Sequence, residues 1–459
     1  MSYAHFFRHL AFPAYERLHG RRTGVLLREC EKRQWWPRAQ LERYQLEQLN
    51  RLLDHCWRNV PFLSERWRDR GLAPGPLGHV RELSRFPVTE KADIRAHYSR
   101  MVARGWEGRV FRKATGGSTG EPMVFGLTQE NYAARNAIMW RGYDWAGAGP
   151  GVRTAYVWGT PARASGPRAW KDALYHAAFN RHFLDAFALT AGNAHAYLDE
   201  IERFGPRALV GYVAPLVELA RVALDAGRKL RLARLRGIVT GAEALYPSQR
   251  DQIERAFGVP VFNTYGCREF MLMAAECPLH AGLHVNIDNL VVEVADGSQP
   301  AMEGASGEVL VTDLTNHGMP FVRYRNGDRA TLAVEACACG RGLPLLASVD
   351  GRVLDLIRTP GGGALAGEYF VHSMLGFPQV SRFQAVQVAA DRLEFRYVCE
   401  PDLAPGVRRE IHDTIARNLG PGMGLTLRRV RAIPLNASGK HRVSVSLENA
   451  ALHPAEPAP

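Results

Sequence analysis

The sequence predicts an α/β protein with a large N-terminal domain of parallel sheets and crossover helices, a β-rich subdomain, and a small, mobile C-terminal α+β domain. First, from about residue 110 short apolar runs alternate with amphipathic helical stretches, the rhythm of parallel strands with crossover helices. Second, after Asn289 the apolar runs lengthen and are separated by Gly, Asp and Asn turns. Third, this pattern breaks near Asp350, and the remaining residues mix strands with one helix.

The length of 459 residues fits this division, since a domain takes roughly 150 residues. We assign residues 1–350 to the N-terminal domain, 351–358 to a hinge and 359–452 to the C-terminal domain. Residues 453–459 are rich in proline and alanine, a composition that predicts a disordered tail.

The individual elements follow from their periodicity. Residues 1–85 are expected to be helical, and Gln40–Val60 carries apolar residues at three- and four-residue spacing, which makes one apolar stripe. In the parallel region the expected strands are Val124–Leu127, Thr154–Trp158, Ala208–Gly211, Gly237–Thr240 and Val259–Asn263, and the expected helices are Gln129–Trp145, Gly192–Phe204, Pro215–Ala226 and Pro247–Phe257. Later we expect strands at Leu290–Val294, Gly307–Thr312, Arg329–Val334, Gln384–Val388, Arg392–Val398 and Thr426–Val430, and a helix at Gly406–Leu419.

Composition narrows the class of protein. The fractions of apolar and charged residues are those of a globular protein, so wholesale disorder and fibrous classes are excluded. No stretch approaches 18 residues without a charge, and the N-terminus lacks the features of a secretory signal. We therefore expect no membrane span and a cytoplasmic location.

The net charge of +12 could indicate nucleic acid, an acidic membrane or a small anionic substrate. Only six of the 58 cationic residues are lysines, and the arginines are spread along the chain without a nucleic-acid-binding motif. No nucleic-acid partner is therefore expected.

A loop rich in glycine and hydroxyl residues precedes the strand at Val124. Its glycines permit unusual dihedral angles and close approach, and its hydroxyls are donors that suit phosphate oxygens. No Gly-Lys-Ser/Thr follows, so it is not a Walker A loop, and by itself such a segment is more often a plain turn. The loop consists of Thr115, Gly116, Gly117, Ser118, Thr119 and Gly120.

The motifs that follow decide between these interpretations. They are Gly241–Glu243, Thr264–Glu269, Tyr324–Asp328, Gly351-Arg352 and Asn436–Lys440. With these motifs in this order, the chain resembles the adenylate-forming superfamily of acyl-CoA synthetases, nonribosomal adenylation domains and luciferases. More narrowly it resembles the phenylacetate-CoA ligase group and its CapK-like branch, which is found with polysaccharide biosynthesis genes.

The resemblance implies a site for ATP and magnesium. The loop 115–120 would hold the β- and γ-phosphates, and Glu269 would coordinate Mg²⁺, which prefers carboxylate oxygens. Asp328 would accept hydrogen bonds from both ribose hydroxyls, and Arg352 would contact ribose or phosphate. The adenine would be lined by Gly241, Ala242 and Glu243 and stacked by Tyr265, which Gly266 follows.

Lys440 is the strongest catalytic candidate. When a carboxylate attacks the α-phosphorus, charge builds between their oxygens, and a compact cation placed there stabilises the transition state. Taken alone, a lysine after Ser-Gly would be a solvated turn residue, and only the upstream motifs favour the catalytic role.

The chain departs from the superfamily pattern at two places. Arg268 stands where Thr or Ser usually precedes the magnesium-binding glutamate, so we count its guanidinium among the catalytic candidates. The hinge motif at 351–355 lacks the first of the two aspartates that are usual in the superfamily. This puts in doubt the domain rotation by which the superfamily switches from adenylation to thioester formation.

A second set of residues suits structural zinc. Cys277, His284, Cys337 and Cys339, with His280 as a substitute ligand, would supply three thiolates and an imidazole. Isolated cysteines are more often small buried apolar residues, and we assign Cys30, Cys56, Cys267 and Cys399 to packing. A cysteine nucleophile is not expected.

The function implied by the resemblance is an ATP-dependent, AMP-forming carboxylate ligase that transfers the acyl group by default to coenzyme A. Trp158, Tyr212 and Asn263 are candidate walls of the acyl pocket, although each aromatic ring could equally belong to the core. Two alternatives stay open: an amide- or ester-forming synthetase that does not use CoA, and a non-catalytic nucleotide-binding scaffold. A homodimer is also left open.

Overall fold

The computed structural model describes most of the chain. The described residues are 2–115, 123–159, 167–190, 192–297, 299–302, 304–352, 357–361, 364–365, 369–370, 373–374, 376–377, 379–417, 419–434 and 442–447.

The N-terminal part is helical, as predicted. Apolar residues of the predicted stripe, Leu49, Leu53 and Cys56 among them, lie buried on one side of the longest of these helices, α4. In the described ranges no helix is both long and apolar enough to span a bilayer. The elements are α1 (Tyr3–Phe6), η1 (Phe7–Ala11), α2 (Phe12–Leu18), α3 (Thr23–Arg33), α4 (Arg38–Asn59), α5 (Pro61–Arg68), η2 (Val80–Arg85) and α6 (Lys91–Met101).

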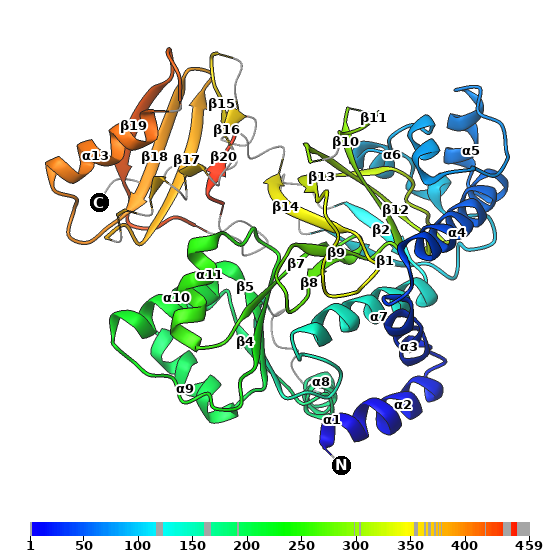
Figure 1. Cartoon of the computed structure of the whole chain (residues 1–459), viewed down its shortest axis with the longest axis horizontal. Helices are drawn as coiled ribbons and strands as arrows, with labels where there is room; N and C mark the ends of the chain where they lie inside the picture. The colour runs from blue at the N-terminus through cyan, green and yellow to red at the C-terminus, as the bar shows by residue number, and fades with distance from the viewer. Residues whose placement is uncertain are drawn as a thin grey trace.

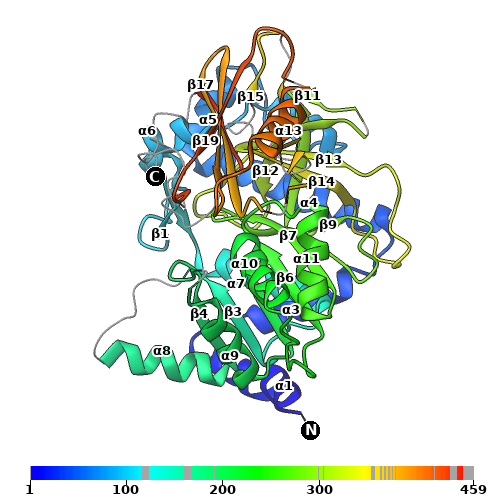
Figure 2. The same cartoon turned by 90° about the vertical axis from the view of Figure 1, so that its left-hand side faces the viewer.

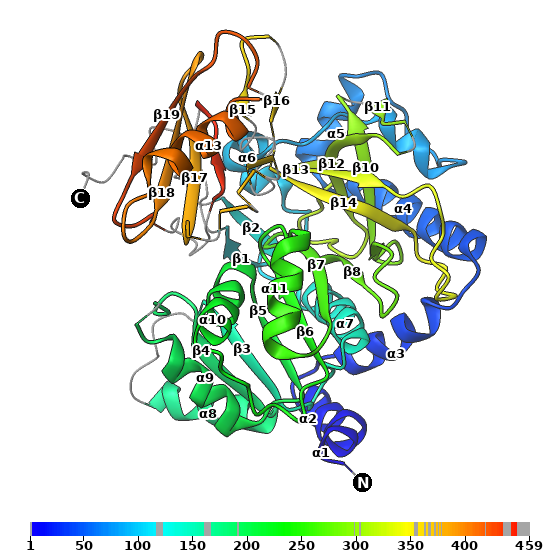
Figure 3. The ribbon, with the colours of Figure 1, turned by 60° about the vertical axis from the view of Figure 1, so that its left-hand side comes forward.

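The parallel half of the central sheet confirms the predicted alternation of strands and helices. The order β7-β6-β5-β3-β4 is parallel throughout. Helices α10 and α11 cover one face, as Figure 3 shows, so β5 and β6 are buried along their whole length. The strands are β3 (Thr154–Trp158), β4 (Arg181–Asp185), β5 (Ala208–Tyr212), β6 (Gly237–Gly241) and β7 (Val261–Cys267), and the helices α7 (Gln129–Trp145), α8 (Pro167–Ala178), α9 (Ala194–Phe204), α10 (Val213–Asp225) and α11 (Pro247–Phe257).

The β-rich region predicted after Asn289 continues the same sheet. Strand β7 pairs in parallel with β6 and antiparallel with β8, and the sheet reaches 12 strands in the order β11-β10-β12-β13-β14-β9-β8-β7-β6-β5-β3-β4. Strands β1 (Phe111–Ala114) and β2 (Val124–Leu127) form a separate hairpin. The antiparallel strands are β8 (Met271–Glu276), β9 (Leu283–Val285), β10 (Leu290–Asp296), β11 (Gln299–Pro300), β12 (Ser306–Asp313), β13 (Tyr324–Leu332) and β14 (Leu345–Arg352).

Two strand boundaries differ from the prediction in a way that bears on the site. Strand β7 continues to Cys267 and β13 starts at Tyr324, so the polar motifs Thr264–Glu269 and Tyr324–Asp328 lie largely in strands. In the sequence, polar residues at these positions are typical of turns. In the structure, their side chains form hydrogen bonds with one another. Strands β4, β8, β9 and β14 and helix α8 were not predicted.

The C-terminal residues form a sheet of their own, in the order β19-β18-β17-β20. Its apolar core includes Phe370, Phe395 and Ile415. Figure 1 shows β17–β19 and α13 apart from the large sheet, and in the view of Figure 2 they lie in front of it. The expected hinge, 351–358, includes residues 353–356, which lie outside the described ranges. The elements are β15 (Ile357–Arg358), β16 (Ala364–Leu365), β17 (Arg382–Ala389), β18 (Arg392–Val398), α13 (Pro405–Ala416), β19 (Gly424–Arg429) and β20 (Ser444–Val445).

A fully buried ion pair joins the helices to the sheet. Both amino groups of Arg141 on α7 donate to the carboxylate of Asp288, each at 2.9 Å, and neither side chain is exposed. Arg33 of α3 donates to the same carboxylate at 3.2 Å, and Arg141 also donates to Asn286 at 2.5 Å. Burial opposes the charge of Asp288, but Arg141 and Arg33 outweigh it and lower the pKa of this carboxyl group.

Replacing Asp288 with alanine is expected to lower the free energy of unfolding by about 3–5 kcal/mol, because Arg141 would stay buried without its carboxylate. Urea unfolding monitored by fluorescence and circular dichroism measures the change. The matched control is Asp54→Ala, which removes the exposed pair with Arg58 at 2.7 Å and should cost less than about 1 kcal/mol. Equal effects of the two substitutions would contradict a structural role for the buried pair.

Candidate active site

The candidate site lies where the central strands end and the sheet changes direction. Open α/β sheets bind ligands beyond the carboxyl ends of their parallel strands. At the ends of β3 and β5, the rings of Trp158 and Tyr212 lie 4.2 Å apart, so two of the predicted acyl-pocket residues are in contact. On β7, the buried side-chain oxygen of Asn263 has no hydrogen-bond partner among the described residues.

The backbone is tightly constrained at the end of β6 and just after it. A side chain at Gly241 would place its Cβ 2.9 Å from Oγ1 of Thr264, so the backbone there is packed too closely for another residue. Ala242 has a φ of +70°, which a residue with a Cβ adopts only where the surroundings impose it. The carboxylate of Glu243 accepts from the backbone N–H of Ala214 at 2.7 Å, at the start of α10. The predicted contacts with adenine would therefore use backbone groups, and they stay a prediction.

A tight hairpin between β7 and β8 presents Arg268 and Glu269. A Cβ on Gly266 would lie 1.8 Å from the carbonyl oxygen of Met271, and Met271 itself has a φ of +66°. Phe270 is fully buried and anchors the turn. Only glycine at position 266 therefore allows the two strands to close with Arg268 exposed and Glu269 turned inward.

Glu269 is held by a tyrosine from the antiparallel half of the sheet. The hydroxyl of Tyr324 donates to Oε1 of Glu269 at 3.0 Å, and Glu269 is only 6% exposed. Burial, and next the carboxylate of Glu269, raise the pKa of Tyr324, so its hydroxyl stays a donor at neutral pH.

Asp328 belongs to a network that joins β13 to β7. Its Oδ2 accepts from the hydroxyl of Tyr265 at 2.9 Å and from Nδ2 of Asn326 at 2.8 Å. Nδ2 of Asn326 also donates to the Tyr265 hydroxyl oxygen at 2.9 Å. Burial, and next the charge of Asp328, raise the pKa of Tyr265. The structure thus brings two of the predicted nucleotide-binding residues together.

Tyr324 and Asn326 were not assigned a role from the sequence, although both lie in the motif that ends in Asp328. One signal could have identified them: residues two apart in a strand point to the same face. Tyr324, Asn326 and Asp328 alternate in this way along β13, and all three contact the β7–β8 segment.

The remaining predicted nucleotide contacts are only partly described. Thr115 closes the base of its loop, because its hydroxyl accepts from the N–H of Met123 and its own N–H donates to the carbonyl of Met123, both at 2.9 Å. On β14, Arg352 is the backbone pairing partner of Asp328 on β13. Residues 116–120 and Lys440 lie outside the described ranges.

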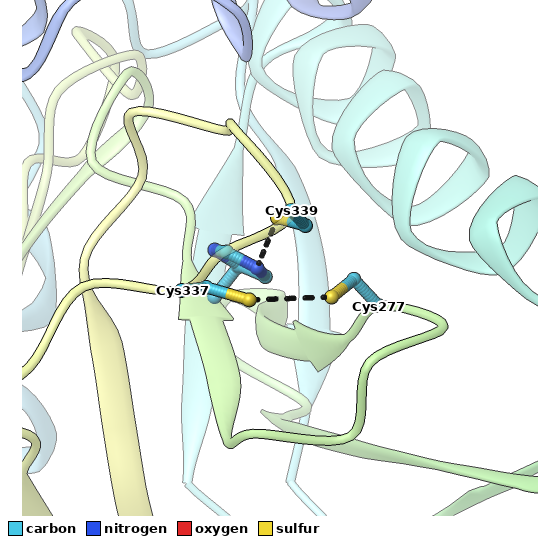
Figure 4. Close-up of side chains that lie close together, drawn as sticks. Cys277, Cys337 and Cys339 are labelled. Atoms are coloured by element: carbon cyan, nitrogen blue, oxygen red, sulfur yellow. Dashed lines mark hydrogen bonds between the residues drawn. The ribbon is translucent and has the colours of Figure 1, made fainter.

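The predicted zinc ligands converge where the end of β8, strand β9 and the loop between β13 and β14 meet. The ligand atoms of Cys277, His284, Cys337 and Cys339 all lie within 4.8 Å of one another. Figure 4 shows the three cysteines, with Sγ of Cys277 3.7 Å from Sγ of Cys337. The substitute ligand His280 is not part of this cluster, because its Nδ1 lies 3.1 Å from a carboxylate oxygen of Glu276.

The chemistry of the cluster suits a tetrahedral metal. His284 donates from Nδ1 to the carbonyl of Leu343 at 3.1 Å, which leaves the lone pair of Nε2 facing Sγ of Cys339 at 3.3 Å. Burial lowers the pKa of His284 to about 4, so its imidazole is neutral at physiological pH. Burial opposes ionisation of Cys339, but hydrogen bonds from Arg341 and from the neighbouring cysteines lower its pKa. Three sulfur atoms and one neutral nitrogen are a donor set that zinc prefers.

Comparison with known proteins places this geometry in context. No protein-family model matches the chain. A phenylacetate-coenzyme A ligase of Thermus thermophilus is 29% identical over 331 residues, which are 70% of this chain and 72% of that protein. The protein CapK of Staphylococcus aureus is 26% identical over 312 residues, 67% of this chain and 65% of its own length.

Solved structures show the fold. A 2-hydroxyisobutyryl-CoA ligase, in the postadenylation state in complex with R3-HIB-AMP, superposes with a TM-score of 0.74 at 21% identity. The match covers 92% of this chain and 93% of that one. Together the comparisons confirm the resemblance to the phenylacetate-CoA ligase group and to CapK that the motifs indicated.

Replacing Gly266 with alanine is expected to lower the free energy of unfolding by about 1–3 kcal/mol, because the new Cβ would overlap the carbonyl of Met271. The same change should displace Glu269 and weaken Mg²⁺-dependent nucleotide binding. Urea unfolding and nucleotide titration measure the two effects. Gly75→Ala is the control, since a Cβ there meets nothing within 4 Å. A fully stable Gly266→Ala protein with unchanged nucleotide affinity would show that the hairpin does not fix the site.

Proposed function

We propose that the protein is an ATP-dependent, AMP-forming acid ligase that activates a carboxylic acid as an acyl-adenylate and transfers the acyl group to coenzyme A. One observation carries this proposal. The hairpin that presents Glu269 and the face of β13 that presents Asp328 meet through two separate contacts, the hydrogen bond from Tyr324 to Glu269 and the hydrogen bond from Tyr265 to Asp328. Two buried carboxylates, one as a ligand for a cation and one as an acceptor for hydroxyl donors, match the needs of a magnesium nucleotide. The ligase relatives support the same activity.

The residues would divide the work of nucleotide binding. Glu269 would hold Mg²⁺, which, when bound, neutralises phosphate charge. Asp328 would accept from the ribose hydroxyls in place of its present donors, Tyr265 and Asn326. The loop at 115–120, the segment 241–243 and Arg352 would complete the nucleotide site, as the resemblance implies.

The proposed reaction has two displacements. A carboxylate oxygen of the acid attacks the α-phosphorus of ATP, the bond from that phosphorus to the bridging oxygen breaks, and pyrophosphate leaves. The sulfur of CoA then attacks the acyl carbon, AMP leaves with the bonding electrons, and the thiol proton is released. Lys440 and Arg268 would stabilise the charge on the reacting oxygens, so catalysis depends on positioning and electrostatics.

We also propose that Cys277, His284, Cys337 and Cys339 hold structural zinc. The cluster would tie the segment after β8 to the loop between β13 and β14, two parts of the chain that are far apart in sequence. No step of the proposed reaction passes through this metal. The cytoplasmic location, the homodimer and a link to polysaccharide biosynthesis stay predictions from the sequence.

The first prediction from the proposed function is carboxylate-dependent exchange of labelled pyrophosphate into ATP. A panel of aryl, fatty, amino and uronic acids should contain a class that supports exchange in the wild type. Lys440→Ala should lower the exchange rate by at least about 100-fold, because the lysine acts on the transition state. Asp328→Ala should mainly raise the KM for ATP, because lost ribose contacts weaken binding.

The control for these variants is Asp69→Ala, which removes an exposed carboxylate near the end of α5. It should leave exchange unchanged. Adding CoA or an amine to the active acid and detecting the product by mass spectrometry distinguishes a thioester from an amide. Tight ATP binding without any exchange would favour the non-catalytic alternative.

The second prediction concerns the metal. Elemental analysis of the purified protein should find about one zinc per chain, and Cys337→Ser should lose zinc and thermal stability together, because closed zinc sites contribute folding energy. Cys56→Ser is the matched control: this cysteine is fully buried outside the cluster, so the substitution should cost packing energy but retain zinc. Wild-type protein without stoichiometric zinc would end the proposal.

A further inference from the structure

Three cationic side chains lie together beside Glu269. The sequence motifs did not include them as a group. They are Lys113 at the end of β1, Arg135 on α7 and Arg268 in the β7–β8 turn. None of them forms an ion pair with another residue in the described part of the chain. An uncompensated cation is costly inside a protein, so the buried Arg135 in particular needs an explanation.

Arg135 is the most deeply buried of the three, at 3% exposure. Its Nη2 donates to the backbone carbonyl of Arg268 at 2.6 Å, which fixes the guanidinium against the turn. Its Nε and Nη1 are buried without any hydrogen-bond acceptor among the described residues. Burial lowers the pKa of Arg135, although nearby Asp313 and Glu269 oppose this. A buried guanidinium with two unused donors is an incomplete anion site.

Lys113 approaches the same region from the other side. Its ammonium group lies 4.5 Å from the centre of the Tyr132 ring, one helical turn before Arg135 on α7. Burial, and next the charges of Arg135 and Arg268, lower the pKa of Lys113 to about 8. The three cations are therefore close enough to repel one another, and an anion between them would relieve that repulsion.

The carboxylates nearby are already engaged. Asp313 accepts from Nδ2 of Asn131 and from the hydroxyl of Thr315, both at 2.9 Å. Glu269 accepts from Tyr324 and is the proposed magnesium ligand. Arg268 is exposed, so the cluster is reached from solvent on the side of the turn.

We propose that Lys113, Arg135 and Arg268 form a seat for the polyphosphate of the reaction, either the terminal phosphates of ATP or the pyrophosphate that leaves. This inference rests on the proposed function, since that reaction supplies the polyphosphate. Three separate cations fit a multiply charged anion better than they fit a single carboxylate, because one guanidinium already satisfies a carboxylate with two hydrogen bonds. The cluster lies beside Glu269, and Lys113 is two residues before Thr115 in the sequence. Both facts favour phosphate groups over the acyl substrate as the bound anion.

Binding measurements without turnover test the proposal. Inorganic pyrophosphate, ATP and AMP are titrated separately by calorimetry, in EDTA so that Mg²⁺ on Glu269 cannot carry the binding. Lys113→Met and Arg268→Gln should each weaken the affinity for pyrophosphate or ATP about tenfold, and Lys113→Met should leave the affinity for AMP unchanged. Arg135→Gln should do the same if it folds, and the other two variants decide the question if it does not.

Lys229→Met and Arg234→Gln are the matched controls, because both residues are exposed in the segment between α10 and β6, at the opposite ends of the parallel strands. If the cluster variants lose both pyrophosphate and ATP binding, the seat takes both anions. If they lose ATP binding alone, the seat takes only the terminal phosphates of ATP. Wild-type protein that binds neither, or variants that bind both normally, would overturn the proposal. If acid-dependent exchange fails but the cluster variants still lose polyphosphate affinity, the proposed function falls while the seat stands.

Discussion

The fold depends on the buried contact between Arg141 and Asp288. Its two parallel hydrogen bonds connect α7 to the turn that enters β10, and Arg33 adds α3 to the same carboxylate. Asp288 stays ionised in the interior because two guanidinium groups surround it, despite the burial of all three side chains. Helix α7 is thereby fixed between α3 and β8, where Gly142 packs too closely against Leu272 for a larger residue.

Helix α7 also contacts the turn that presents the candidate site. Arg135 is on α7 as well, and its bond to the carbonyl of Arg268 connects the helix directly to the β7–β8 turn. The turn in turn places Glu269 within reach of Tyr324 on β13. The buried ion pair and the buried carboxylate of Glu269 are thus connected through one helix, α7.

The sheet supplies the second constraint. Its change from parallel to antiparallel pairing occurs at β7, so the carboxyl ends of β5 and β6 and one face of β13 border the same region. Residues more than fifty positions apart, such as Tyr265 and Asp328, meet because of this change. The cluster of Cys277, His284, Cys337 and Cys339 lies in the same antiparallel half, where it brings the segment after β8 to the loop between β13 and β14.

The sequence by itself determined the alternation of strands and helices, the order of the motifs that resemble those of adenylate-forming ligases and the three cysteines of the cluster, because periodicity and residue chemistry are local properties. Tertiary structure alone decided that the parallel and β-rich regions share one sheet, that Tyr324 and Asn326 support Glu269 and Asp328, and that His284 rather than His280 joins the cysteines. It also brought Lys113 and Arg135 beside Arg268. Pairing across a sheet and contact between distant elements depend on register and burial, which no spacing along the chain records.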